Sequence, residues 1–562
     1  MLGNHNKITR NLRLLAGLGL LSPVLITAWP NAAPTGVYIV QGHDLAAVAA
    51  AVRTAGGEIT HELGIIRAVT ARLTEAQRQA LRSSSGIERI YENRTVTSAA
   101  KPVDDGTALE DTSHMTLIGA DRLHAQGITG ANVTLAVLDT GFFNQKSLSQ
   151  NTRKKTRILA QYDALADAPL DQWQDTDGSG HGAHVASIGV NSAVSGETGQ
   201  YRGVAPDANL VVVRAFDEEG KGSYADVIRG LDWLVAHKTA YGIRVLNLSF
   251  SAPPQSHYWD DPLNQAVMAA WQAGIVVVAS AGNTGPAPMT VGVPGNVPYV
   301  ITVGAMTDNH TPGDPTDDRL ATFSSVGPTA EGLVKPEVVA PGGHVVALMS
   351  DSGRIAREHP EFHDGGIYFT MSGTSQAAAV VSGVAALLLQ ADPSLTPDDV
   401  KCRLMATALA ARTADGAPAF SVFQQGAGLV NAYDAAHSGE RGCANRGMDV
   451  AADLAGTAHY GGFARQDADG NYYLEGPDGA PLHVWNGAYL WRDAYLWRDA
   501  YLWRDAYLWR DNFLWGDAYL WRDAYLWRDA YLWRDAYLWR DSVLSGAVLA
   551  EPVGINVWVP QE

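Results

Sequence analysis

Four polar residues, widely separated in the sequence, are of the types that one kind of chemistry requires. They stand in four motifs, which are Asp139 in AVLDTGF, His181 in DGSGHGAHVAS, Asn283 in VVVASAGNTG and Ser375 in FTMSGTSQAAAVV. A serine, a histidine and an acid are the minimum set that activates a hydroxyl group for attack on a carbonyl carbon. The amide of Asn283 and the backbone N–H of Ser375 are suited to stabilise the negative oxygen that then develops.

The segments around these motifs predict the elements that hold them. Five runs are almost entirely apolar, which is typical of strands covered on both faces of a parallel sheet: VTLAVLD, LVVVRAF, RVLNLSF, GIVVVASAG and YVITVGA. Helical patterns such as YADVIRGLDWLVAH and PLNQAVMAAWQAG alternate with them. This alternation predicts a doubly wound α/β domain over residues 114–437. Such domains place functional residues beyond the carboxyl ends of their strands.

Each of the four residues taken alone is more often structural, because aspartates end strands and serines cap helices in many folds. Their order along the chain is Asp, His and Ser, with Asn between His and Ser. This order, with its motifs, resembles that of the subtilisin-like serine proteases, the subtilase family. Other segments that resemble family motifs are GVAPDANLVVVRAF, NLSFS, TVGVPGNVPYVITVGA, TFSSVGP, KPEVVAPG and GTSQAAA.

The resemblance implies a subtilisin-like fold in which Asp139, His181 and Ser375 form a catalytic triad. Asn283 and the backbone N–H of Ser375 would then form the oxyanion hole, and His184 would be a second, structural histidine. The implied activity is that of a serine endopeptidase (EC 3.4.21), which cleaves protein or peptide substrates through an acyl-enzyme intermediate.

The resemblance also implies where a substrate binds. The family binds peptide as an added strand, which here corresponds to residues 247–252 and 279–282. The expected substrate-binding residues are Ser249, Phe250, Ser251, Ala281, Gly282 and Gly292. Gly292 would be the floor of a pocket that admits a large side chain, and Ser251, where glycine is common, narrows one wall. Thr284 replaces an acid found in some relatives. We therefore expect a broad preference for large, uncharged residues before the cut.

Some residues depart from the family pattern. Ala183, Gln376, Ala379 and Val380 replace residues that are usual next to the histidine and the serine. No high-affinity calcium loop is recognisable in VNSAVSGETGQYRG, so no cofactor is certain and calcium, although compatible with the family, is not assigned to a site. The acids Asp314, Asp317 and Asp318 are better explained as a solvated turn than as a metal site.

The first hundred residues predict a signal and a small folded unit. Residues 1–33 combine early basic residues with a short apolar run and read as an export signal peptide rather than an uncleaved anchor. Residues 34–100 show the order strand, helix, strand, strand, helix, strand. This unit resembles the family's inhibitory propeptide, which would be a partner of the enzyme; the alternative is a permanent small domain. A polar linker, 101–113, follows, and we expect the cut between residues 97 and 113.

The totals agree with an exported globular protein. The 562 residues carry a net charge of −18, which argues against general nucleic-acid binding, and 46% are hydrophobic. The predicted localisation is secreted or at the cell surface. The two cysteines, Cys402 and Cys443, form either one disulfide or two unpaired thiols, and the sequence favours neither.

The C-terminal part is dominated by a hexapeptide repeat. A Gly- and Asp-rich stretch, 438–484, reads as a linker, and residues 485–562 form a repeat tail with nine AYLWRD-like units over 488–541, one of them altered to NFLWGD. Six is an even number, so strand-like units would align tyrosine and tryptophan on one face, and we expect a β-rich, solenoid-like tail. The alternative is a disordered tail. A surface, a polysaccharide or a protein are candidate ligands, and a mere spacer is the other candidate role.

Two functions of different classes follow. The first is an exported serine endopeptidase that is made as a self-processing precursor. The alternative is a surface or adhesion protein that acts through its Trp/Tyr repeat and whose protease domain is inactive. The complete set of Asp139, His181, Asn283 and Ser375 favours the first.

Overall fold

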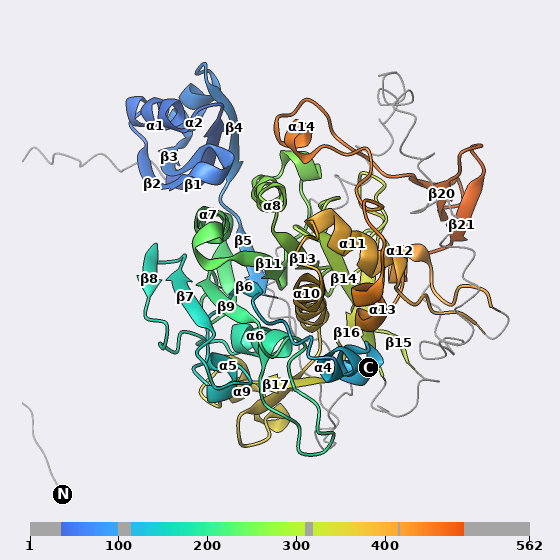
Figure 1. The fold of residues 1–562 in the computed structure, drawn as a ribbon. Helices are drawn as coiled ribbons and strands as arrows, with labels where there is room; N and C mark the ends of the chain where they lie inside the picture. The colour runs from blue at the N-terminus through green and yellow to red at the C-terminus, as the bar shows by residue number, and fades with distance from the viewer. Residues whose placement is uncertain (1–34, 99–113, 309–317, 414–415, 488–562) are drawn as a thin grey trace, which may run out of the picture.

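The computed structural model describes residues 35–98, 114–308, 318–413 and 416–487 (Figure 1). The expected signal peptide, the whole of the expected linker 101–113 and the hexapeptide repeats lie outside the described residues. Three parts are described: an N-terminal unit (35–92), a main domain (114–437) and a C-terminal arm (438–487).

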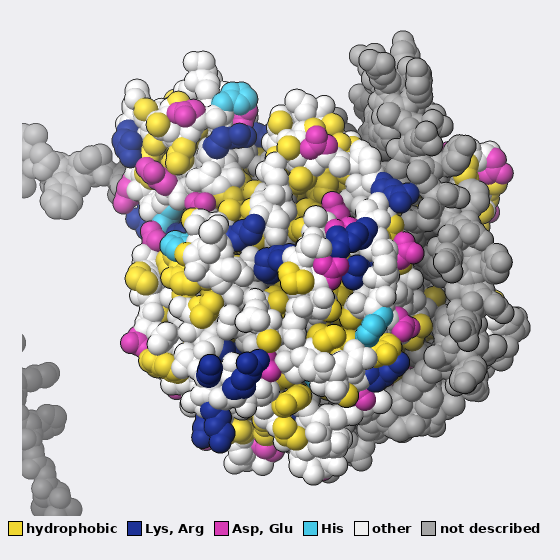
Figure 2. All heavy atoms as spheres, viewed as in Figure 1, with side chains coloured by type: hydrophobic (Ala, Val, Ile, Leu, Met, Phe, Trp, Pro, Cys, Tyr) yellow, Lys and Arg dark blue, Asp and Glu magenta, His cyan; other side chains and the backbone are white. Residues whose placement is uncertain are grey.

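The N-terminal unit has the order of elements that its sequence predicts. Its elements are β1 (Thr35–Gly42), α1 (Leu45–Thr54), β2 (Glu58–Leu63), η1 (Gly64–Ile66), β3 (Ala68–Thr74), α2 (Glu75–Arg82) and β4 (Ile87–Glu92). The four strands pair antiparallel in the order β2-β3-β1-β4. A capping box begins α2, because the Thr74 side chain accepts from Gln77 N and the Gln77 side chain accepts from Thr74 N. Figure 2 shows the unit as a separate lobe of the molecule.

The main domain is built on a nine-stranded sheet. Its order is β15-β14-β13-β11-β6-β9-β7-β8, with β16 beside β14. Every pairing among the interior strands is parallel, and only β8 and β15 run antiparallel to their neighbours. The strands are β6 (Thr134–Asp139), β7 (Ile158–Asp163), β8 (Ala168–Leu170), β9 (Asn209–Arg214), β11 (Ile243–Leu248), β13 (Val276–Ser280), β14 (Ile301–Thr307), β15 (Arg319–Leu320) and β16 (Val338–Pro341).

Helices cover both faces of this sheet, as expected for a doubly wound domain. The helices α7 (Tyr224–Tyr241) and α8 (Pro262–Gln272) pack on one face, and α6 (His181–Val190) and α10 (Thr374–Ala391) on the other (Figure 1). Among the described helices, α10 alone is long and apolar enough to cross a membrane, and 89% of it is buried inside the protein. Its alanines and small residues let it lie in the centre of the domain.

Shorter elements connect this framework. They are α3 (His114–Leu117), α4 (Ala120–Ala125), α5 (Lys146–Ser149), β10 (Lys221–Ser223), β12 (Phe250–Ser251), η2 (Tyr258–Asp260), β17 (Val345–Leu348), α9 (Arg354–Glu358), η3 (Pro360–Phe362), β18 (Tyr368–Met371), α11 (Pro397–Ala406), α12 (Val422–Gln425) and α13 (Ala432–His437).

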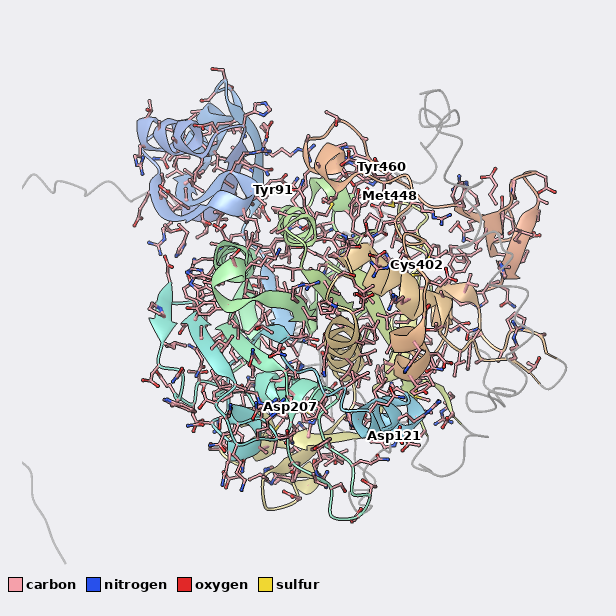
Figure 3. The ribbon with its side chains drawn as sticks, viewed as in Figure 1. Tyr91, Asp121, Asp207, Cys402, Met448 and Tyr460 are labelled. Atoms are coloured by element: carbon pink, nitrogen blue, oxygen red, sulfur yellow. A yellow bond between two sulfur atoms is a disulfide. The ribbon has the colours of Figure 1, made fainter. Side chains whose placement is uncertain are left out.

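The N-terminal unit stands on α7 and α8 (Figure 3). Asp232 of α7 accepts from Gly64 N at 2.9 Å. The first turn of α7 receives a cap from the residue directly after the unit, because Ala225 N donates to Asn93 Oδ1 at 2.9 Å. After the unit, β5 (Thr95–Ser98) continues into the main domain and pairs antiparallel with both β10 and β12. The chain therefore joins the two parts through one short shared sheet.

The C-terminal arm is folded, although its composition reads as a linker. It contains α14 (Val450–Leu454), β19 (Ala464–Gln466), β20 (Tyr472–Glu475) and β21 (Pro481–Trp485). Trp485, which the sequence assigns to the repeat tail, pairs with Tyr472 in the arm's own sheet and packs against Phe423 of the main domain. Asp453 accepts from Tyr258 Oη at 2.7 Å and Tyr299 Oη at 3.1 Å. The segment 438–487 is therefore packed onto the main domain.

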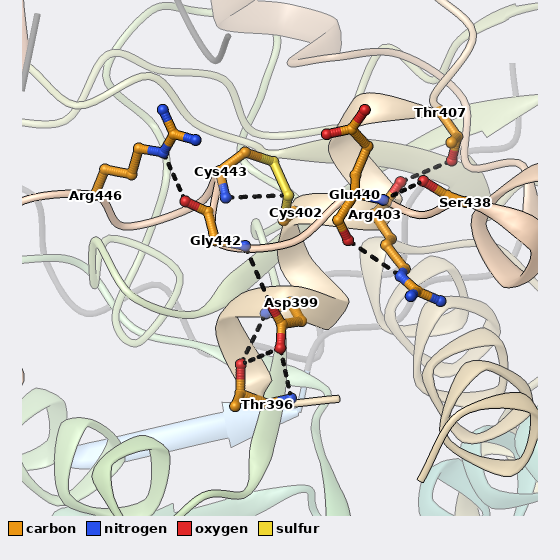
Figure 4. Close-up of a disulfide and its surroundings, with 10 residues drawn as sticks. All are labelled: Thr396, Asp399, Cys402, Arg403, Thr407, Ser438, Glu440, Gly442, Cys443 and Arg446. Carbon is orange, nitrogen blue, oxygen red and sulfur yellow. Dashed lines mark hydrogen bonds between the residues drawn. A yellow bond between two sulfur atoms is a disulfide. The ribbon is translucent and has the colours of Figure 1, made fainter. Parts of the chain in front are cut away.

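A disulfide closes the start of the arm onto α11. Cys402 and Cys443 are bonded, with their Cα atoms 5.2 Å apart (Figure 4). Beside the disulfide, Gly442 N donates to Asp399 Oδ1 at 3.0 Å. Of the two readings that the sequence left open for the cysteines, the structure contains the disulfide.

Candidate active site

The acid and the histidine meet at the carboxyl edge of the sheet. Asp139 is the last residue of β6 and His181 is the first residue of α6. His181 Nδ1 lies 2.6 Å from Asp139 Oδ1, and both side chains are fully buried. The same carboxylate oxygen accepts from Thr140 N at 2.7 Å. A buried carboxylate bonded to Nδ1 fixes the orientation of the ring and stabilises its protonated form.

A second aspartate, which the sequence analysis did not single out, fixes the position of Asp139 relative to His181. Asp177 Oδ1 accepts from Thr140 Oγ1 at 2.7 Å and from Gly180 N at 2.8 Å, and Asp177 Oδ2 accepts from Ala183 N at 2.7 Å. It thus bonds both to the residue after Asp139 and to the first turn of α6. Burial raises the pKa of this carboxyl, and the bond from Ala183 N counteracts that rise.

The first turns of α6 and α10 touch through two side chains. His184 Nδ1 lies 3.4 Å from Gln376 Nε2, and His184 Nε2 lies 3.0 Å from the carbonyl oxygen of Phe369. Burial lowers the pKa of His184 to about 3, so this ring is neutral. His184 follows His181 by one turn, and Gln376 follows Ser375 directly. This contact therefore fixes the position of α6 relative to α10.

Ser375 is the second residue of α10, and its environment is polar and buried. Ser375 Oγ donates to the carbonyl oxygen of Ser249 at 3.1 Å, and Ser249 Oγ donates to the carbonyl oxygen of Ser375 at 2.9 Å. Behind them, Asn247 Nδ2 donates to Ser249 Oγ at 2.8 Å, and Ser382 Oγ donates to Asn247 Oδ1 at 2.9 Å. This network ties the start of α10 to the segment between β11 and β12.

Asn283 presents an amide donor next to Ser375. Its Oδ1 accepts from Thr374 N at 2.9 Å and from Thr374 Oγ1 at 2.8 Å, which fixes the direction of the amide. Its Nδ2 is buried and makes no hydrogen bond to any of the residues that the structure describes. A buried donor without a partner is costly. Such a donor is suited to an oxygen that becomes negative only during a reaction.

A strand of the chain itself lies where a peptide substrate is expected. In the antiparallel register of β5 with β12, Ser98 lies opposite Phe250 and Thr97 opposite Ser251. On its other edge, β5 pairs with β10, so it is the middle strand of this small sheet. Pairing of this kind uses backbone groups and therefore accepts many sequences.

The other residues expected to bind substrate lie together beside this strand. Gly292 N donates to the carbonyl oxygen of Ala281 at 3.1 Å, and a backbone bridge joins Ala252 to Val293. A Cβ atom on Gly292 would collide with Ser251 Oγ, and one on Gly282 would lie 3.0 Å from it. The structure therefore brings Ser249, Phe250, Ser251, Ala281, Gly282 and Gly292 into one region.

No metal site is built by the described side chains. In residues 35–98, 114–308, 318–413 and 416–487, no group of three or more His, Cys, Asp or Glu is arranged to hold a metal ion. The loop after α6 instead encloses a buried arginine. Arg157 donates to the carbonyl oxygens of Gln150 at 2.6 Å and Pro206 at 2.7 Å, and also to that of Val190. Burial lowers the pKa of this guanidinium to about 9.

Known proteins share this arrangement. The sequence profile of the subtilase family matches residues 130–428, which is more than half of the chain. The chain belongs to the subtilase family. Serine protease AprX of Bacillus subtilis is 38% identical over 342 residues, which cover 60% of this chain and 73% of that protein. Subtilisin DY of Bacillus licheniformis is 34% identical over 322 residues, which cover 57% of this chain and 96% of that protein.

Among solved structures, fervidolysin from Fervidobacterium pennivorans, described as a keratinolytic enzyme related to subtilisin, has a similar fold. Its TM-score is 0.56 at 23% identity, over 72% of this chain and 61% of that one. This likeness concerns the fold alone. Together with the sequence matches, it shows that the subtilase chain has a subtilisin-like α/β fold and is a serine protease of the subtilisin type.

In this subtilase, the residues that position the four candidate catalytic residues carry weaker sequence signals than those four residues themselves. Asp177 stands four residues before His181 in DGSGHGAH, and an acid close to the histidine motif was its only signal. Thr140 and Thr374 have no sequence signal of their own, because each is simply the neighbour of a candidate catalytic residue. Ser249 was expected from the resemblance as a substrate-binding residue, and its hydroxyl also bonds to the backbone of Ser375.

Proposed function

We propose that this subtilase is an exported endopeptidase in which Asp139, His181 and Ser375 perform acyl transfer. The observation that carries the proposal is the buried His181–Asp139 pair at 2.6 Å, together with a serine at the start of α10 and the Nδ2 donor of Asn283, which bonds to none of the described residues. Each group comes from a different element at the same edge of the sheet. This arrangement supports the roles, and labelling and mutation test them.

In this proposal, Ser375 Oγ attacks the carbonyl carbon of the scissile peptide bond while His181 Nε2 takes the hydroxyl proton. The carbonyl oxygen becomes negative and accepts from Asn283 Nδ2 and the backbone N–H of Ser375. When the C–N bond breaks, the protonated His181 gives its proton to the leaving amine, and an acyl-Ser375 ester remains. A water molecule then attacks this ester and passes a proton to His181. The bond between the acyl group and Ser375 Oγ breaks, His181 returns the proton to Ser375 Oγ, and the acid product leaves.

The proposal extends to a precursor that inhibits itself. The N-terminal unit rests on α7 and α8, and β5 fills the position of a substrate strand between β10 and β12. A segment that follows this unit and pairs in that groove excludes other peptides until it is cut and released. We therefore propose that the unit is an inhibitory propeptide and that the enzyme cuts its own chain between residues 97 and 113.

The proposed substrates are proteins and peptides outside the cell, because residues 1–33 read as an export signal. The preference expected from the sequence is a broad one for large, uncharged residues before the cut. The hexapeptide repeat would serve as an attachment or a spacer. In the alternative, a surface protein with an inactive protease domain, the repeat alone would carry the function.

One pair of variants separates these functions. We expect the purified wild-type protein to release peptides from casein and Ser375→Ala to lose this activity by roughly 10⁶-fold. Ser394→Ala, a matched change on an exposed residue after α10, should keep it. The Ser375→Ala precursor should also remain uncut before residue 114, as seen by N-terminal sequencing. A wild-type protein that is processed yet releases no peptides would support the adhesion function instead.

A further inference from the structure

The space above the pocket glycine is occupied by a side chain of the enzyme. Ser251 belongs to β12, the strand against which β5 pairs. A Cβ atom on Gly292 would collide with Ser251 Oγ and would lie 3.3 Å from Ser251 Cβ. The room that glycine at position 292 leaves free is therefore taken up by the serine hydroxyl.

Rotation of this hydroxyl does not reopen the pocket. An ideal Cβ on Gly282 would lie 3.0 Å from Ser251 Oγ and 3.5 Å from Ser251 Cβ. The Cβ atom of Ser251 is placed by the backbone, which is held by the Ala252–Val293 bridge and by the bond from Ser280 Oγ to the carbonyl oxygen of Phe250. Ser251 Cβ thus stays between the two glycines in every rotamer.

The register of β5 shows which substrate residue meets this wall. Because Ser98 pairs with Phe250 and the strands are antiparallel, the next residue of a substrate in the same register would face Ser249. The carbonyl oxygen of Ser249 lies 3.1 Å from Ser375 Oγ. The substrate residue that faces Ser249 is therefore the one beside the nucleophile, and its side chain must use the pocket that Ser251 shortens.

We propose that Ser251 restricts this enzyme to cleavage after small side chains, such as alanine, and excludes aromatic ones. The inference rests on the proposed function. It changes the preference before the cut from the large side chains expected from Gly292 to small ones. In the amino-acid sequence, Ser98 is followed by Ala99 and Ala100. Self-processing after Ala99 would then obey the same rule, and the mature chain would begin at Ala100.

The test uses peptides that differ only in the residue before the cut, with alanine, leucine or phenylalanine at that position. For the mature wild-type enzyme we expect kcat/KM to be at least about 10-fold higher for alanine than for phenylalanine, since one methylene in a pocket changes selectivity by roughly 10- to 200-fold. Ser251→Gly should raise the ratio of the phenylalanine value to the alanine value at least about 10-fold. Ser251→Ala should raise the phenylalanine value less than Ser251→Gly does, because it removes the hydroxyl that fills the space but keeps the Cβ atom.

Ser394→Gly is the matched control and should leave the whole series unchanged. A wild-type enzyme that prefers phenylalanine, or a Ser251→Gly enzyme with the wild-type ratio, would overturn the inference and leave the protease activity intact. Failure of the wild-type protein to cleave casein and every peptide would instead remove the proposed function, and the inference with it. N-terminal sequencing of the mature chain should find Ala100 first; a start after a large residue contradicts the proposal.

Discussion

At the scale of residues, the site depends on side chains outside the set of Asp139, His181, Asn283 and Ser375. Asp177 bonds to Thr140, Gly180 and Ala183, and so connects the strand that ends in Asp139 to the helix that begins with His181. An error of about 1 Å in such a site can reduce the rate about 100-fold. The geometry of the acid–histidine pair therefore rests on a second carboxylate, that of Asp177.

Replacement of this carboxylate by an amide tests that role. Asp177→Asn places N–H groups toward Ala183 N or Gly180 N, so α6 must shift relative to β6. We expect kcat to fall by roughly 10- to 100-fold with little change in KM, because the peptide groove on β12 is untouched. Asp171→Asn, in the same loop but exposed, is the control. Equal effects of the two variants, or a change confined to KM, would argue against positioning by Asp177.

His184 gives a pH dependence of stability whose sign is defined. Burial lowers its pKa to about 3 in the folded protein, whereas the unfolded chain has a value near 6.5. Between these values the unfolded chain binds one more proton, so stability falls as the pH drops from about 6.5 toward 3. In the Ser375→Ala background, which prevents self-digestion, His184→Gln should flatten this decline in urea midpoints. His437→Gln, at an exposed site, should leave it as steep as before.

The candidate catalytic residues stand out in the sequence because each lies in a long motif next to an apolar strand or a small-residue helix. The supporting residues could not be ranked in the same way. Ser251 illustrates the difference, since its substitution for glycine was visible in the sequence. Its contact with Gly292 depends on how β12 and the residues before β14 fold together.

At the scale of elements, buried charge connects the strands near the end of the sheet to α11. Glu337 accepts from Lys335 Nζ at 2.7 Å and lies 2.9 Å from Lys401 Nζ, and its second oxygen accepts from Thr302 N at 2.8 Å. All three charged side chains are almost completely buried. Burial lowers the pKa of Lys335 to about 7, against the opposing effect of Glu337. One carboxylate thus serves two buried ammonium groups.

Removal of that charge should destabilise the fold strongly. Glu337→Gln leaves two buried cations without a counter-charge, and the loss of one partner in such a group costs about 3–5 kcal/mol. We expect a large drop in the urea midpoint at pH 6, where both lysines are protonated in the unfolded chain. Glu361→Gln, a change at an exposed residue, is the control. It should change the free energy of unfolding by no more than about 0.5 kcal/mol. A Glu337→Gln protein as stable as that control would contradict this account of the network.

The long apolar runs predicted five central strands, because parallel strands covered on both faces need continuous hydrophobic sequence. Two parallel strands were not among them. In β7, Gln161 is buried but its amide donates to the carbonyl oxygens of Asp171 and Gln174, so its sequence looks too polar for an interior strand. In β16, only four residues lie between polar and proline-containing segments.

At the scale of the whole molecule, the C-terminal arm is held by polar groups as well as by the disulfide. Asp453 accepts from Tyr258 and Tyr299 of the main domain, and His459 Nδ1 lies 2.7 Å from its other oxygen. The composition of this segment, rich in glycine and aspartate, hides these contacts because they join residues more than 150 positions apart. Local composition alone therefore predicts a linker where the fold has a docked arm.

Loss of this contact should release the arm. Asp453→Ala leaves two buried tyrosine hydroxyls without their acceptor, which costs about 1–3 kcal/mol for each. We expect a lower thermal midpoint in the Ser375→Ala background and faster hydrogen exchange in residues 450–487. Asp469→Ala, an exposed change in the same arm, should alter neither. Unchanged hydrogen exchange in Asp453→Ala would show that the disulfide and the packing of Trp485 against Phe423 hold the arm without the Asp453 carboxylate.

The central claim is that Ser375, activated by the His181–Asp139 pair, is the nucleophile of a protease. A fluorophosphonate, which reacts with activated serines, tests this directly when the mature protein is digested and its peptides are analysed by mass spectrometry. The account predicts one adduct per molecule, on Ser375, with complete loss of casein hydrolysis, and no adduct in His181→Ala. An adduct on another residue, or hydrolysis that persists in fully labelled protein, would contradict it.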